Sequence, residues 1–173
     1  MNNQRGMTLI ETMLVVSAAA LLVVATAAYS IPWLARESMR GAIYDVQTYL
    51  QLSRIEAVSR NRECRMVLNT TSRTLQILDS NATVSTTDDT ELYERALPSS
   101  VTFARPDMGL PVTLSQIGST GSYQVVFDSD GTVTSGTGDV YIFGGDRFGR
   151  ISVFAAGGTQ VERWNGVSWE IGS

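Results

Sequence analysis

The hydrophobic residues of this chain follow two different patterns. Near the start, residues 12–35 form a mostly apolar run that contains no Asp, Glu, Lys or Arg. About 20 consecutive apolar residues suffice to cross a bilayer as a helix, so the run predicts a membrane-spanning helix. Pro32 lies late in this run, and proline removes one helical hydrogen bond. It indicates a bend where the helix leaves the membrane or, as the alternative, local melting that lets the helix stretch.

After Pro32 the pattern becomes that of an amphipathic helix. Apolar and small side chains recur every three or four residues, which places them on one helical face. The face comprises Ile43, Val46, Leu50, Ser53 and Ala57, widened by Ala42, Tyr49 and Val58. We expect it to pack on a globular domain. The arginines of this stretch fall mostly elsewhere, which is typical of a solvated face rather than a nucleic-acid site.

From residue 64 onward, short runs bounded by Gly, Asp and Asn predict β-strands. The predicted strands are residues 65–69, 73–79, 101–105, 112–116, 123–128, 140–143, 151–155, 160–164 and 167–171. The polar segment 80–91 predicts a loop, and Asn165-Gly166 predicts a hairpin turn of type I′. The fold class is therefore α+β, in which a long N-terminal helix with a membrane-spanning first half packs on an antiparallel β-sheet domain.

Composition argues against an enzyme. The chain has 173 residues, no His and no Lys, so all 13 basic residues are Arg. It therefore lacks the commonest general base and any amine nucleophile. The single Cys64 can form neither an internal disulfide nor a Cys-rich zinc site, and we interpret it as a packed side chain. Asp128-Ser129-Asp130-Gly131 lacks the remaining ligands of a calcium loop and predicts a hairpin turn. We expect no cofactor and no metal site.

Charge is unevenly distributed. Residues 36–65 contain six Arg and four acidic residues, a net charge of +2. Residues 66–173 contain six Arg and twelve acidic residues, a net charge of −6. An acidic globular part disfavours broad electrostatic binding to nucleic acid.

The apolar run has three interpretations. It is a secretory signal peptide cut near residues 25–27, a plain membrane anchor, or a retained segment that follows a short leader. Glu11 favours the third interpretation. A carboxylate inside an apolar helix costs about 2.5–3.5 kcal/mol on insertion scales, and a signal peptide or plain anchor gains nothing from it. Ionisable groups at such positions normally have a partner and a function.

The beginning of the chain resembles the type IV pilin and pseudopilin superfamily. Arg5-Gly6 is followed by Met7-Thr8-Leu9-Ile10-Glu11 and the uncharged run, although the family usually has Phe at the position of Met7. The resemblance implies that a prepilin peptidase cuts between Gly6 and Met7 and that the new N-terminal Met7 is methylated. It also implies that Glu11 meets the N-terminal amine of a neighbouring subunit in a filament. Such a buried pair would set the axial register between subunits.

A second resemblance is to the GspH/FimT branch of minor pilins and minor pseudopilins. It rests on Ser53-Arg54-Ile55-Glu56-Ala57 and the strand-like residues 64–68, with Ile55 where the branch often has Ser. Together the two resemblances cover roughly residues 5–80. They imply a minor subunit that primes or caps a type II secretion pseudopilus or a type IV pilus. The implied partners are the prepilin peptidase, other pilin or pseudopilin subunits, an inner-membrane assembly platform and membrane lipid.

The resemblance also implies a domain order and a location. Residues 1–6 are the leader, 7–35 the transmembrane and filament-core helix, 36–63 its amphipathic continuation, and 64–173 the β-rich domain. The expected location is the bacterial inner membrane, with one membrane pass and the C-terminal domain in the periplasm.

A DNA-binding minor pilin of a DNA-uptake pilus is the alternative function. Some FimT-like minor pilins bind DNA through Arg-rich C-terminal loops, and Asp146-Arg147-Phe148-Gly149-Arg150 is similar to these loops. Arg147 and Arg150 would contact phosphate while the aromatic ring stacks on a base. The adjacent Asp146 and the acidic domain disfavour nucleic acid as a partner.

Overall fold

The computed structural model describes residues 8–80, 89–118 and 121–171. It divides into two compact units, Met1–Leu34 and Ala35–Ser173. One helix, α1 (Leu9–Arg60), provides the described part of the first unit and begins the second. Residue 32 is helical. The predicted cleavage residues Gly6 and Met7 lie outside the described residues.

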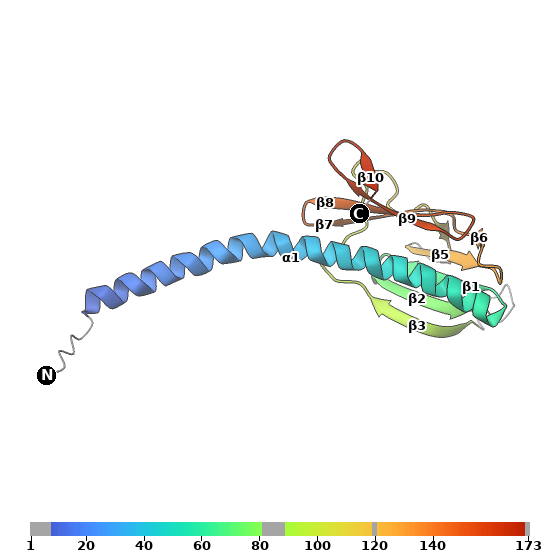
Figure 1. The fold of residues 1–173 in the computed structure, drawn as a ribbon, viewed down its shortest axis with the longest axis horizontal. Helices are drawn as coiled ribbons and strands as arrows, with labels where there is room; N and C mark the ends of the chain where they lie inside the picture. Colours follow the sequence, from blue (N-terminus) through green and yellow to red (C-terminus); the bar gives the residue numbers. More distant parts are fainter. Residues whose placement is uncertain (1–7, 81–88, 119–120, 172–173) are drawn as a thin grey trace. The chain divides into compact units, whose positions relative to one another are not determined.

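In the described residues of the second unit, ten β-strands form two antiparallel sheets; Figure 1 shows their arrangement. The first sheet has the order β3-β2-β1-β5-β4, and β6 also pairs with β5. The second has the order β10-β9-β8-β7. The strands are β1 (Cys64–Asn69), β2 (Thr74–Asp79), β3 (Thr90–Ala96), β4 (Ser115–Gln116), β5 (Ser122–Phe127), β6 (Val133–Ser135), β7 (Gly138–Gly144), β8 (Arg147–Val153), β9 (Thr159–Trp164) and β10 (Trp169–Ile171). The predicted α+β class, with a helix on antiparallel sheets, is confirmed.

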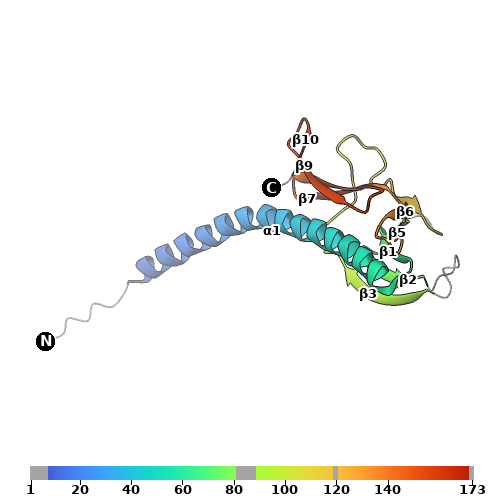
Figure 2. The same cartoon turned by 45° about the vertical axis from the view of Figure 1, so that its right-hand side comes forward.

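The core lies between the second half of α1 and the two sheets. Figure 2 shows this part of the helix beside β1, β2 and β3. The predicted helical face is buried, and Val46, Leu50 and Ala57 have no exposed surface. Complete burial of an aliphatic side chain such as Val or Leu contributes about 1.5–3 kcal/mol. The extension of the face to Val58 is wrong, because half of that side chain is exposed.

Close approach of helix and sheet depends on glycine in β8. A Cβ atom at Gly149 would lie 2.3 Å from Cδ1 of Ile43, a buried residue of α1. The absence of a side chain at this position therefore lets the helix lie directly on the second sheet.

Two predictions for residues 64–173 are wrong. The loop predicted over residues 80–91 overlaps β3, which begins at Thr90. Almost every residue of β3 is exposed, so this edge strand shows no buried alternation. Conversely, the apolar segment 101–105 is not a strand and makes only an isolated bridge from Thr102 to Phe143. Hydrophobic alternation identifies half-buried strands and misses short or polar ones.

The predicted turns have mixed outcomes. Residues 128–131 form the turn between β5 and β6, with the Gly131 amide donating to the Asp128 carbonyl over 2.8 Å. The hairpin at Asn165-Gly166 is confirmed, but type I′ is wrong. That turn requires positive φ at both central residues, and only Gly166 has it. Instead, the Asn165 side-chain oxygen accepts hydrogen bonds from the amides of Val167 and Ser168, which closes a longer loop.

Candidate assembly interface

In its described residues, the first unit presents an apolar helix surface that is not buried. From Leu9 to Thr26 the mean hydropathy is 2.2, and none of this segment is buried inside the protein. Leu9, for example, is 80% exposed. By length and composition this is the one helical segment in the described residues that can cross a membrane. Because so much apolar surface is unfavourable in water, the segment requires lipid or other helices around it.

The hydroxyl groups in this segment are suited to an apolar environment. Thr12, Ser17, Thr26 and Ser30 each donate a hydrogen bond to a backbone carbonyl three or four residues earlier in the helix, over 2.5–2.8 Å. In lipid, every polar group must find its partner within the protein. These hydroxyls therefore impose little cost on burial.

Glu11 lies in the first turn of the helix, where Thr8 acts as the N-terminal cap. The backbone amide of Glu11 lies 3.0 Å from the Thr8 carbonyl and 3.4 Å from its Oγ1. Thr-x-x-Glu is the signature of a capping box, and the positive end of the helix dipole favours an anion there. This cap was not among the predictions from the sequence, although the spacing of Thr8 and Glu11 is typical of it. The side chain of Glu11 is exposed, so its carboxylate is available to a partner.

Within the second unit, an ion pair ties the helix to the turn between β7 and β8. Arg36 donates from Nε and from one terminal nitrogen to the two carboxylate oxygens of Asp146, each over 2.8 Å. The Arg36 hydrogen bond holds the pKa of Asp146 below its usual value. Arg36 and Asp146 are far apart along the chain, so their pairing could not be predicted from the sequence.

The two arginines predicted for DNA binding do not form a joint patch. Arg147 is exposed and lies 4.0 Å from Asp146, which Arg36 already engages. Arg150 is half-buried, bonds Glu162 through Nε over 2.5 Å and lies over the ring of Trp169 at 4.9 Å. Residues three apart on a strand point to opposite faces. The structure therefore gives Arg150 an intramolecular partner and separates it from Arg147.

Cys64 is buried in the core, as the sequence analysis expected. Burial, with a smaller contribution from the Asp79 carboxylate, raises the pKa of the thiol to about 11. The thiol is therefore protonated and unreactive at neutral pH. Among the described residues, no group of three His, Cys, Asp or Glu is placed to hold a metal ion.

The raised pKa of Cys64 gives stability a pH dependence. A folded-state pKa above the ordinary value of 9.0 stabilises the fold below pH 9, and this contribution is lost as pH rises toward 11. The test is a comparison of wild type with Cys64→Ala by urea unfolding of the full chain in detergent at a series of pH values. The stability difference between them should stay constant below pH 9 and shift against wild type between pH 9 and 11. A difference independent of pH up to 11 would show that the thiol is not desolvated.

Comparison with known families decides the assignment. The family model described as type II transport protein GspH matches residues 42–157, and the prokaryotic N-terminal methylation motif matches residues 1–27. The chain belongs to the GspH family. The predicted membership of the type IV pilin-like superfamily, as a GspH-type minor pseudopilin, is thereby confirmed. The methylation motif covers Gly6, Met7 and Glu11 together with most of the apolar run.

Solved structures with a similar fold include two of the minor pseudopilin EpsH from the type 2 secretion system of Vibrio cholerae. The match to one of them covers 73% of this chain and 94% of the EpsH chain, with 16% sequence identity and a TM-score of 0.48. The other is 14% identical, covers 74% and 94%, and has a TM-score of 0.49. None of the curated proteins compared matches the chain.

Proposed function

We propose that this GspH-type pseudopilin primes or caps a type II secretion pseudopilus. The observation that carries the proposal is the exposed apolar helix with one carboxylate in its first turn. Such a helix is a poor match to water and to plain lipid, but it suits the interior of a bundle of identical or related helices. The second unit provides a folded head for contacts with other subunits.

Processing would generate the partner of Glu11. A prepilin peptidase would cut between Gly6 and Met7 and remove the leader, residues 1–6. The free amine of Met7 would then lie close to a glutamate of the adjoining subunit, while Glu11 accepts the amine of another. Truncating one member of a buried charge pair costs about 3–5 kcal/mol, so the pairing would strongly favour one axial register.

The remaining parts would follow the order of the chain. Residues 7–35 would occupy the inner membrane in a single pass, and then the filament core. Residues 36–63 and the β-rich residues 64–173 would lie on the periplasmic side. The assembly platform in the inner membrane would extract the helix from lipid into the growing filament. The six arginines and twelve acids of residues 66–173 favour protein partners over nucleic acid.

Priming and capping are tested by the position of the protein within each filament and by the number of filaments per cell. An epitope tag in the second unit, detected by gold labelling, should appear at one end of each pseudopilus. Deleting the chain should lower the number of filaments per cell more than it lowers their length, because an initiator limits nucleation. Gold distributed along the whole filament, or unchanged filament numbers after deletion, would rule out this role.

A further inference from the structure

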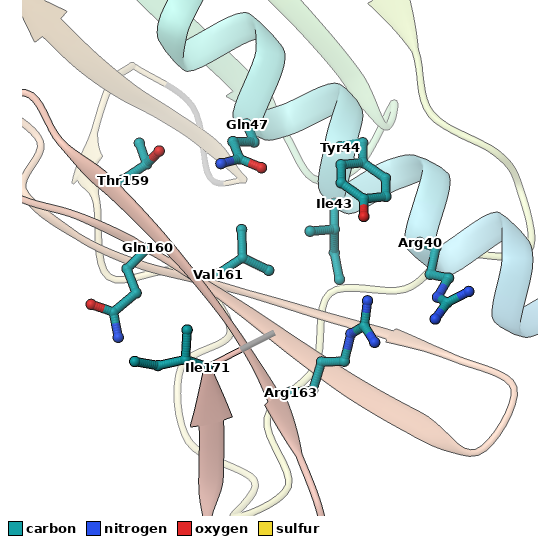
Figure 3. Close-up of a pocket in the computed structure, with 9 residues that line it drawn as sticks. All are labelled: Arg40, Ile43, Tyr44, Gln47, Thr159, Gln160, Val161, Arg163 and Ile171. Atoms are coloured by element: carbon teal, nitrogen blue, oxygen red, sulfur yellow. The ribbon is translucent and has the colours of Figure 1, made fainter. Parts of the chain in front are cut away.

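A groove of about 260 Å³ opens between the second half of α1 and the edge of the second sheet (Figure 3). Both walls belong to the second unit. Ile43, Tyr44 and neighbouring polar residues of α1 form one wall, and the other is formed by Val161 with its neighbours in β9 and by Ile171 of β10. The lining combines apolar side chains with polar and charged ones, as protein-binding surfaces do.

Among the residues that the structure describes, the first half of β9 has a neighbouring strand on one side only. Strand β10 pairs only with residues 162–164 of β9, from Trp169 opposite Trp164 to Ile171 opposite Glu162. The first half of β9, residues 159–161, pairs with β8 on its other side and extends beyond the described end of β10. A strand edge of this kind can accept an extended segment of another chain through backbone hydrogen bonds.

Two arginines extend from opposite walls toward the same space in the groove, Arg40 from α1 and Arg163 from β9 (Figure 3). Arg40 forms a long ion pair of 3.9 Å with Glu37 on the exposed surface of the helix. Arg163 lies opposite Glu170 in the register of β9 and β10, but Glu170 accepts a hydrogen bond from Asn165. No ion pair to Arg163 occurs among the residues that the structure describes.

The groove is lined by two arginines and by no carboxylate. Its β9 wall belongs to residues 66–173, which carry a net charge of −6. Two like charges that face each other repel, and an anion between them removes the repulsion. Arginine binds carboxylates with two parallel hydrogen bonds, so a carboxylate is the matching ligand.

We infer that the groove binds an extended, carboxylate-bearing segment of another pseudopilin subunit. The segment adds to the free edge of β9, places its acidic side chain between Arg40 and Arg163, and packs an apolar side chain on Ile43 and Val161. The inference rests on the proposed assembly function only for the identity of the partner as a subunit. It adds a contact made by the second unit to the helix packing described above.

The test uses site-specific photo-crosslinking in the bacterium's own cells. A photoreactive phenylalanine analogue replaces Gln160, and mass spectrometry maps the residues to which it attaches. The expected attachment is to an acidic, extended segment of another pseudopilin. Attachment to the C-terminal residues of the same chain, to lipid or to a helical segment would overturn the inference, and so would the absence of any crosslink.

Charge variants separate a specific contact from mere proximity. Arg163→Gln and Arg40→Gln should each lower the crosslink yield about ten-fold, the scale of one charge-assisted hydrogen bond. Arg147→Gln, which removes an exposed arginine from the same sheet, is the matched control and should leave the yield unchanged. An unchanged yield in Arg163→Gln overturns the groove contact.

Helix-mediated incorporation is measured in the same cells, so that the two claims fail separately. Loss of the crosslink in Arg163→Gln with normal processing and membrane insertion supports the groove contact. If the wild-type chain is not found in pseudopili, that result contradicts the assembly function and not the groove contact.

Discussion

Replacing Glu11 with glutamine is expected to remove this protein from assembled pseudopili while leaving it in the membrane. Glutamine retains the capping geometry of Thr-x-x-Glu or Gln at the helix start, so the helix should still begin near Leu9. Only the negative charge is lost. Since an unpaired amine inside an apolar helix bundle is costly, we expect the fraction of chain in sheared filaments to fall ten-fold or more, as about 1.4 kcal/mol is a factor of ten.

Two further variants define what the charge contributes. Glu11→Leu should give the same assembly defect and should favour membrane insertion, by less than the roughly 2.5–3.5 kcal/mol that a charge costs at the centre of a membrane helix, because Glu11 lies in the first turn. Ser17→Ala, which removes a hydroxyl bonded only within its own helix, should assemble normally. Filament incorporation of Glu11→Gln at the wild-type level would mean that the carboxylate has no partner in the assembly.

The second large effect is expected at Gly136, between β6 and β7. Its φ is +92°, and a Cβ atom there would lie 2.0 Å from the carbonyl oxygen of Gln124 in β5. The clash is with backbone, so no side-chain movement can relieve it. Adding the cost of left-handed φ to that of overpacking, we expect Gly136→Ala to destabilise the second unit by at least about 3 kcal/mol.

Gly158→Ala is the matched control for this prediction. Gly158 lies in the loop before β9, its φ is not positive, and a Cβ atom there would meet nothing within 4 Å. In Gly158→Ala, the free energy of unfolding of the second unit should change by less than about 0.5 kcal/mol. Both variants are measured by urea unfolding of the full chain in detergent, followed by the near-ultraviolet signal to which Trp164 of β9 and Trp169 of β10 contribute. Equal stabilities would show that the tight backbone packing at Gly136 is not as described.

The helix and its buried face could be predicted from the sequence because they depend on local periodicity. Side chains such as Val46 and Leu50 recur at helical spacing, and the protein buries them. Strand β3 could not be predicted this way. It is a polar edge strand held by pairing with β2, which is a long-range contact without a local pattern.

The contact surfaces could likewise be predicted from the sequence only where they depend on local pattern. Glu11 and the apolar run can be recognised from the sequence, because a carboxylate in a segment of this hydropathy is chemically unusual. The groove between α1 and β9 does not, since Arg40 and Arg163 meet only after the sheet has folded against the helix. Neither arginine belongs to a motif, and the local sequence around each is typical of a solvated surface.

The proposed assembly requires that the mature protein retain the apolar helix. Chains recovered from sheared pseudopili and analysed by intact mass and N-terminal sequencing should begin at Met7, lack residues 1–6 and carry one added methyl group. A mature chain that begins after Ala27, or one that still begins at Met1, would contradict the account, because Glu11 would then be lost or would have no processed amine to meet.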